Sequence, residues 1–237
     1  MKRIAEGVYL LEGLRGCNTY LLVSGSSLAL VDAGLGKDVD QIISQIEEAG
    51  FDPFALETIV VTHAHPDHIG GLAGLARRLH ADILAHRLEA PIIEGRAQLP
   101  ARTALQKAMN WLGRRNPQVV AGKLDVARRL EDGDMVDALG GLRVLHTPGH
   151  TPGCLCLLQE EKGALFCGDL LFNGNPLTGR GGLRYAPRAF SVDPDEVSRS
   201  AQSLSSLTIH ALCMGHGEPL VYENGVTMEE VLKTISR

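Results

Sequence analysis

A cluster of histidines directly after a run of β-branched residues constrains this sequence more than any other feature. Positions 58–61 read TIVV, and positions 63–68 read HAHPDH. β-Branched residues favour strands, so the cluster is expected to begin where a strand ends. The chain has only nine histidines in 237 residues. Three of them beside an aspartate in one loop indicate a ligand-binding site rather than a chance grouping.

Three further places repeat this arrangement. Predicted strands at 142–147, 164–168 and 209–215 each lead into a loop with glycine or proline, and these loops carry His150, Asp169 and His216. Ligands in open sheet proteins gather beyond the carboxyl ends of strands, so these side chains are expected to meet. Imidazole nitrogens and carboxylate oxygens are the usual ligands of zinc and similar ions. The potential ligands are His63, His65, Asp67, His68, His150, Asp169 and His216.

Seven ligands exceed the needs of one tetrahedral ion and suit two ions held close together, with one carboxylate reaching both. We therefore expect two divalent metal ions per chain. Zinc is the expected ion, with iron or manganese as alternatives, because histidine and aspartate bind all three. Asp32, at the end of a predicted strand at 28–34, is expected behind the ligands, where it receives a histidine N–H or backbone N–H groups.

The remaining pattern predicts an α/β protein with its sheets inside and its helices outside. No linker rich in glycine, proline or serine divides the chain, so we expect one domain over 1–237. Further strands are predicted at 8–11, 19–23, 82–86, 124–130 and 154–158, and helices at 37–49, 69–80, 194–206 and 227–236.

The segment 87–122 departs from this pattern and is predicted to be a helical insert. Prolines at 91, 100 and 117 break it into short pieces, one of them a helix at 102–113 with Trp111, the only tryptophan. We expect a lid over the metal site, with Trp111 against the substrate. A dimer interface or a packed appendage are the alternatives, and either a monomer or a homodimer is compatible with the sequence.

Composition narrows the class of partner. The net charge of −5 argues against nucleic acid, which requires a basic face. No apolar stretch is long enough to span a membrane, and no signal peptide is evident, so we expect a cytoplasmic protein that acts on a small molecule. The five cysteines lie mostly in apolar runs and are odd in number, which favours free buried thiols.

The motifs THAHPDH, TPGHTPG, CGDLLF and GHGEP, in this order after NTYLL and LVDAG, resemble those of the metallo-β-lactamase superfamily. The resemblance extends from about 18 to 217 and implies a four-layer αββα sandwich. It also implies that His63, His65 and His150 bind a first ion and that Asp67, His68 and His216 bind a second. Asp169 would then bridge the two ions.

The resemblance and the ligand set together predict hydrolysis by a metal-bridging hydroxide. The branch that the chain most resembles is that of glyoxalase II thioesterases and lactonases, which implies a small thioester, lactone or other ester as substrate. Asp67 is expected to pass a proton to the leaving group, Tyr185 to bind the developing oxyanion and Arg184 an anionic group of the substrate. A mono-iron oxygenase resembling persulfide dioxygenases, a phosphodiesterase and a β-lactamase are the alternatives.

Overall fold

The computed structural model describes residues 1–103, 106–107, 124–174 and 181–235. The amino-terminal half of the chain forms a seven-stranded sheet whose strands follow one another in sequence order. The strands β1 to β4 pair antiparallel, and β4 to β7 run parallel. The strands of this first sheet are β1 (Lys2–Ala5), β2 (Val8–Leu10), β3 (Tyr20–Ser24), β4 (Ser27–Val31), β5 (Leu56–Val61), β6 (Asp82–His86) and β7 (Arg128–Leu130).

The second half forms a six-stranded sheet in the order β15-β14-β11-β10-β9-β8, and a separate ribbon pairs β12 with β13. Within the six-stranded sheet β11 and β14 are parallel and the other pairs are antiparallel. The strands are β8 (Met135–Val136), β9 (Leu142–His146), β10 (Leu155–Gln159), β11 (Ala164–Gly168), β12 (Leu171–Asn173), β13 (Leu183–Tyr185), β14 (Thr208–Met214) and β15 (Leu220–Thr227).

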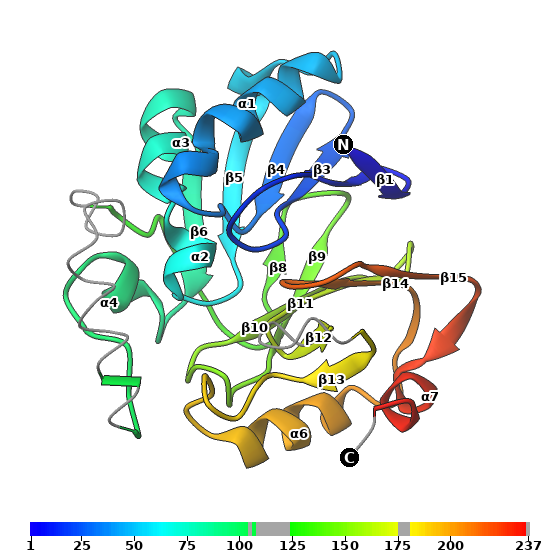
Figure 1. The fold of residues 1–237 in the computed structure, drawn as a ribbon. Coiled ribbons are helices and arrows are strands. Elements are labelled where there is room, and N and C mark those ends of the chain that lie inside the picture. The colour runs from blue at the N-terminus through cyan, green and yellow to red at the C-terminus, as the bar shows by residue number, and fades with distance from the viewer. Residues whose placement is uncertain (104–105, 108–123, 175–180, 236–237) are drawn as a thin grey trace.

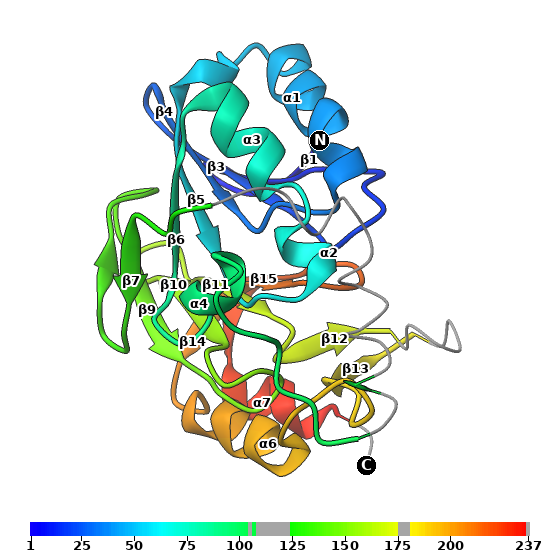
Figure 2. The same cartoon turned by 90° about the vertical axis from the view of Figure 1, so that its left-hand side faces the viewer.

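Helices cover the two outer faces of the paired sheets (Figure 1). The helices and short 3-10 turns are η1 (Gly36–Asp38), α1 (Val39–Glu48), η2 (Pro53–Ala55), α2 (Pro66–Ile69), α3 (Leu72–Leu79), α4 (Ala90–Ile93), α6 (Pro194–Ser203) and α7 (Met228–Lys233). Figure 2 shows α1 and α3 on the outer face of the first sheet and α6 and α7 on the opposite side of the molecule. None of the described helices is long and apolar enough to cross a membrane.

Three buried apolar layers hold these elements together. The side chains of a strand alternate between its two faces, so Leu30 packs toward α1 and α3 while its neighbour Val31 packs between the sheets. A third layer joins the outer face of the second sheet to Val197 of α6 and Val231 of α7. Both faces of each sheet are therefore buried, and the four-layer αββα architecture expected from the sequence is confirmed.

This topology places several strand ends at one edge. Since β4 and β5 are parallel neighbours, and β11 and β14 are too, the chain leaves each pair of strands in the same direction. Asp32 follows β4 and His63 follows β5, whereas Asp169 follows β11 and His216 follows β14. The sheet order thus brings residues far apart in sequence to a shared edge.

The structure corrects several predicted elements. The helix expected at 69–80 begins later, as α3, and the short helix α2, which was not predicted, precedes it across Gly70 and Gly71. A Cβ atom on Gly71 would lie 2.1 Å from the carbonyl oxygen of Ala33, so the chain can pass here only as glycine. The strand predicted at 124–130 is confined to 128–130, and the short strands β1, β8, β12 and β13, together with β15, were not predicted.

Two other expectations have different outcomes. The five cysteines are free and buried, as their apolar surroundings predicted. The segment 87–122 contains the short helix α4, but most of the helix predicted at 102–113, including Trp111, lies outside the described residues.

Candidate metal centre

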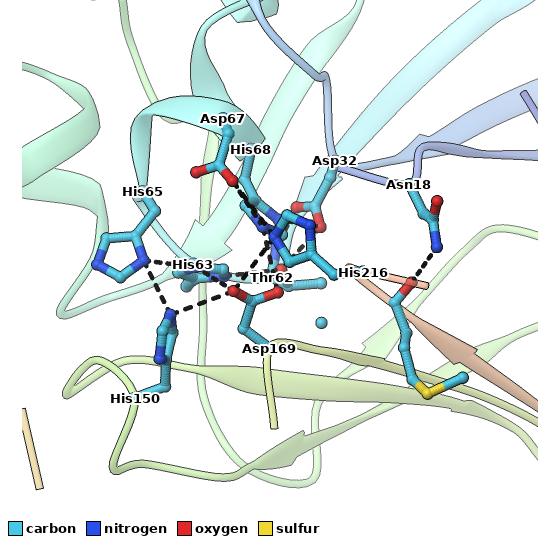
Figure 3. Close-up of polar contacts among 12 residues, drawn as sticks. Asn18, Asp32, Thr62, His63, His65, Asp67, His68, His150, Asp169 and His216 are labelled. Carbon is cyan, nitrogen blue, oxygen red and sulfur yellow. Dashed lines mark hydrogen bonds and ion pairs between the residues drawn. The ribbon is translucent and has the colours of Figure 1, made fainter. Parts of the chain in front are cut away.

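The seven candidate ligands come together on loops that follow strands of both sheets (Figure 3). The first sheet supplies the loop after β5 and the helix α2 that follows it, and the second supplies the loops after β9, β11 and β14. These segments carry His63, His65, Asp67, His68, His150, Asp169 and His216. The ligand-bearing edge predicted from the strand ends is therefore present as a compact cluster of imidazoles and carboxylates.

The start of α2 divides the HAHPDH motif into two parts. His65 is the N-cap residue, with an extended backbone, and Pro66 is the first helical residue. Proline suits this position because its fixed φ angle is helical and it has no N–H to leave unsatisfied. The two histidines before Pro66 therefore lie on extended chain, whereas Asp67 and His68 project from the first helical turn.

The first group of ligands consists of His63, His65 and His150. Nδ1 of His65 lies 3.1 Å from Nε2 of His63 and 2.8 Å from Nε2 of His150. Oδ2 of Asp169 lies 3.3 Å from Nε2 of His150 and 3.8 Å from Nε2 of His63. Ligands at tetrahedral positions around zinc, with bonds of about 2.0–2.1 Å, are about 3.3 Å apart. The spacing of these four atoms is therefore that of a single coordination shell.

The second group consists of Asp67, His68 and His216. Nε2 of His216 lies 3.3 Å from Oδ2 of Asp67 and 3.5 Å from Oδ2 of Asp169. Nε2 of His68 lies 4.0 Å from Oδ2 of Asp67 and 3.3 Å from Oδ1 of Asp169. Asp169 thus faces both groups, which is the position that a bridging carboxylate would take.

Unpartnered polar atoms at the junction fit a cation. Nε2 of His68 and Oδ1 of Asp169 are buried and have no hydrogen-bond partner, although they lie 3.3 Å apart. Buried polar atoms are nearly always partnered, because an unmet donor or acceptor loses its interaction with water. A divalent ion between these atoms would satisfy both, and the donor set of imidazoles and carboxylates is the one that zinc, iron and manganese accept.

Residues behind the ligands fix the orientation of the rings. Asp32 accepts hydrogen bonds from the backbone N–H and the hydroxyl of Thr62, and its Oδ2 lies 2.8 Å from Nδ1 of His68. The hydroxyl of Thr62 also lies 3.2 Å from Nδ1 of His63. A histidine whose Nδ1 donates to a carboxylate keeps its Nε2 lone pair for a metal. Asp32 therefore lies where the sequence led us to expect it, behind His68.

Burial and charge set different protonation states in the two groups. Burial, together with the nearby His150, lowers the pKa of His65 to about 3. Burial and the charge of His68 also lower the pKa of His63 well below its ordinary value. Burial lowers the pKa of His216 as well, but Asp169 and Asp67 outweigh it and raise the pKa to about 9. His63 and His65 of the first group are thus neutral imidazoles, whereas His216 of the second group is governed by the neighbouring carboxylates.

Burial raises the pKa of Asp67, but the neighbouring His68 and His216 outweigh that effect and lower it to about 2. Asp169 is subject to the same balance, and its pKa lies well below the ordinary value. Both carboxylates are therefore ionised near neutral pH. Burial lowers the pKa of His68 and His216, but neighbouring groups, these carboxylates among them, outweigh it and raise the pKa of both, so a bound cation would take the place of the protons on these two imidazoles.

The sequence did not single out two buried polar residues beside this cluster. Glu89 is fully buried and contacts the loops that carry the first group. Ser191 lies behind His150, with its hydroxyl 3.3 Å from Nδ1 of that histidine. Glu89 follows the end of β6, so the rule that identified the ligands, a polar residue after a strand end, also applied to it. Its place at the start of the predicted insert concealed it.

Two of the residues expected to contact substrate make contacts within or near the ribbon of β12 and β13, and the third is not described. Tyr185 lies at the end of β13, opposite Leu171 of β12, and it packs partly buried against the third apolar layer. Arg184 donates hydrogen bonds to the carbonyl oxygens of Gly181 and Gly182. Trp111 lies outside the described residues. The substrate-binding roles of all three stay predictions.

The four-layer αββα sandwich and the cluster of histidines and aspartates at its strand ends place this protein in the class of α/β metal-binding enzymes. Residues 13–216 match the family model of the metallo-β-lactamase superfamily, and the chain belongs to this superfamily of metal-dependent hydrolases.

Relatives and solved structures agree with this assignment. The chain is 27% identical over 233 residues to a Bacillus subtilis protein named "Probable metallo-hydrolase YflN", covering 93% of this chain and 87% of that protein. It is 36% identical over 155 residues to a hydroxyacylglutathione hydrolase of Anaeromyxobacter dehalogenans, covering 65% of this chain and 46% of that enzyme. A metallo-β-lactamase family protein from Thermus thermophilus has a similar structure, with a TM-score of 0.71, 26% identity, and coverage of 98% of this chain and 78% of that one.

Proposed function

We propose that the protein is a binuclear metal-dependent hydrolase that acts on a small thioester, lactone or other ester. The observation that carries this proposal is the position of Asp169. Its two carboxylate oxygens face the ligand atoms of both groups at 3.3–3.8 Å. One carboxylate between two sets of histidines is the arrangement that two closely spaced divalent ions require.

In this proposal His63, His65 and His150 hold one ion, Asp67, His68 and His216 hold the other, and Asp169 contacts both. Zinc is the ion we expect. Bound ions of this kind lower the pKa of a coordinated water to near neutrality and polarise the bond under attack. No serine or cysteine nucleophile is then required. The described cysteines are buried, and burial raises the pKa of Cys17 to about 11, so its thiol is a poor nucleophile.

Asp67 is the residue proposed to handle the proton. Its side chain is 38% exposed, whereas that of Asp169 is 5% exposed, so Asp67 is accessible from solvent and from bound substrate. The pKa of Asp67, about 2, keeps its carboxylate ionised near neutral pH, so it can take a proton from the attacking water and would release that proton readily. It would then pass this proton to the leaving group.

The substrate class rests on the ligand set and on the relatives. Hydroxyacylglutathione hydrolases from several bacteria are 30–36% identical to this chain over 155–189 residues, which supports a thioester. This chain covers only 45–57% of those enzymes. We therefore do not extend the glutathione portion of their substrates to this protein. The substrate that we propose is therefore a thioester or lactone of a small acyl group.

Activity assays on the purified protein test this proposal. The protein loaded with zinc, manganese or iron is offered acyl-glutathione thioesters, other acyl thioesters, lactones, phosphodiesters and β-lactams. We expect hydrolysis of a thioester or lactone with two ions bound, and poor turnover of β-lactams. β-Lactam turnover above that of every thioester and lactone would place the chain in another branch. One iron per chain with oxygen consumption would instead indicate the dioxygenase alternative.

A further inference from the structure

A fully buried carboxylate, Glu89, joins the two loops that carry the first group of ligands. It follows β6 and immediately precedes α4, and none of its surface is exposed to solvent. Its Oε2 accepts a hydrogen bond of 2.9 Å from the backbone N–H of Ala64. Its Oε1 accepts two bonds of 2.8 Å, from the hydroxyl of Thr151 and the backbone N–H of Gly153.

Two of the three donors are chain neighbours of first-group histidines, and the third, Gly153, lies in the same loop as His150. Ala64 stands between His63 and His65 in the chain, and Thr151 follows His150. The loop after β5 and the loop after β9 belong to different sheets. Glu89 therefore connects two segments that come from different sheets. The relative position of these segments determines the spacing of the first-group nitrogens.

Gly153 shows how closely this connection is packed. A Cβ atom at this position would lie 2.7 Å from Cγ and 2.8 Å from Oε1 of Glu89, and 2.9 Å from Nδ1 of His86. These distances are shorter than normal contacts, so a side chain here would displace the carboxylate. The chain thus brings the backbone of the His150 loop directly onto Glu89, which is a second observation that the contact is built into the fold.

Only a carboxylate can satisfy these three donors. Each of its oxygens accepts without donating, whereas a glutamine has one acceptor oxygen and an amide that donates. In a glutamine variant the amide would face either the N–H of Ala64 or the donors of the His150 loop. At least one buried donor would then lose its acceptor, and the distance between the two loops would no longer be fixed.

We propose that Glu89 is a positioning residue for the first metal group, and that it acts on His63, His65 and His150 without contacting the metal. This inference rests on the proposed function, because it requires that the first group binds an ion. Partners that orient metal ligands contribute about 10–100-fold to metal affinity. The described contacts of Glu89 reach no ligand of the second group, so its effect should be confined to the first.

Zinc affinity measured on chelated protein tests the proposal, with Glu94→Gln as the matched control. Glu94 lies at the end of the same helix, and its side chain, 5% exposed, pairs with Arg129 at 3.3 Å. The same substitution there replaces a buried carboxylate by an amide without touching a ligand loop. Denaturant unfolding of both chelated variants compares their general stability.

Two background variants separate the two groups. In His216→Ala the remaining ion reports the first group, and in His150→Ala it reports the second. We expect Glu89→Gln to weaken zinc binding about 10–100-fold in the His216→Ala background and to leave it within about threefold in the His150→Ala background. Glu94→Gln should leave both within about threefold. If Glu89→Gln does not fold, Thr151→Val removes one of the three bonds and should weaken the first group about 3–10-fold.

The outcomes distinguish a failure of the inference about Glu89 from a failure of the proposed function. If the wild-type protein binds no zinc, the proposed function fails. If the wild type binds two ions and Glu89→Gln binds both with unchanged affinity, the inference about Glu89 alone is wrong. Equal weakening of both groups would show that Glu89 supports the fold generally and does not position the first group.

Discussion

The two ligand groups share Asp169 but differ in burial, in charge and in what supports them. The side chains of His63 and His150 in the first group are 0% and 2% exposed. In the second group those of Asp67 and His216 are 38% and 26% exposed and that of His68 is 0% exposed, whereas His65 is the one partly exposed ligand of the first group. Exposed ligands exchange with water and with solutes more readily than ligands enclosed by protein. The first group is therefore suited to retain an ion and the second to meet the substrate.

The residues that hold the ligands in place also differ between the two groups. Behind the first group lie the side chains of Thr62, Ser191 and Glu89, all of them buried. The second group depends partly on the chain before β3. The backbone N–H of Cys17 donates to the carbonyl of Asp67, and the amide of Asn18 donates to the carbonyls of Met214 and Gly217. The ring of His216 also stacks on Phe172, with the ring centroids 4.9 Å apart.

The largest effect should follow removal of the residue that the two groups share. Asp169→Ala leaves neither group with its fourth ligand and leaves five imidazoles without their central negative charge. Metal ions supply several kcal/mol of stabilisation to such reactions, and about 4 kcal/mol corresponds to about a 1000-fold change in rate. We expect kcat/KM to fall at least about 1000-fold, with fewer than two ions bound. Two ions and near-normal turnover in this variant would rule out a bridging role.

Chelation should remove the two ions in sequence rather than together. Because Asp67 and His216 are partly exposed, whereas His65 is the one partly exposed ligand of the first group, the second-group ion should leave first as a chelator is titrated into the loaded protein. We expect the two dissociation constants to differ by about 10–100-fold. Metal analysis after dialysis against graded chelator measures them. Loss of both ions in one step would contradict the difference between the groups, and His216→Ala, which should lose only the weaker ion, is the control.

A substitution behind the ligands should affect one group more than the other. Asp32→Asn replaces an acceptor of the His68 Nδ1 proton and of two Thr62 donors by a group that can itself donate. We expect weaker binding in the second group by about 10–100-fold, with a smaller change in the first, measured by zinc titration of the chelated variant. An equal loss in both groups would indicate that Asp32 acts through Thr62 on His63 as strongly as on His68.

The smallest effect is expected at the predicted lid. Trp111→Ala should raise KM about 3–10-fold or change substrate preference, because the lost ring would have excluded water beside the substrate. Metal content and oligomeric state should stay as in the wild type. Dissociation of a dimer with normal kinetics in the monomers would instead show that the segment forms an interface.

Strand ends and ligand types were predictable from the sequence because both are local properties. The run before His63 is rich in β-branched residues and the run before Asp169 is apolar, so a polar side chain directly after each run stands out as a candidate ligand. The break between α2 and α3 was not predictable, because the approach of Gly71 to the carbonyl of Ala33 is a tertiary contact. The contacts of Glu89 were not predictable either, because its partners are 25, 62 and 64 residues away in the chain.

The short strands escaped prediction for a related reason. β12 and β13 have three residues each, too few to show a period-two pattern, and their pairing depends on a connection of about ten residues that carries no strand signal. β15 is exposed along much of its length, so its sequence lacks the apolar runs that marked the buried strands. Edge strands and ribbons of this kind are defined by their neighbours in the sheet rather than by their own residues.

A crystal structure of the zinc-loaded protein, with the ions located by anomalous scattering, tests the central claim most directly. We expect two ions about 3.5–4 Å apart, one bound by His63, His65 and His150 and the other by Asp67, His68 and His216. Asp169 should contact both. A single ion under excess zinc, or an Asp169 carboxylate turned away from the ions, would contradict the binuclear account.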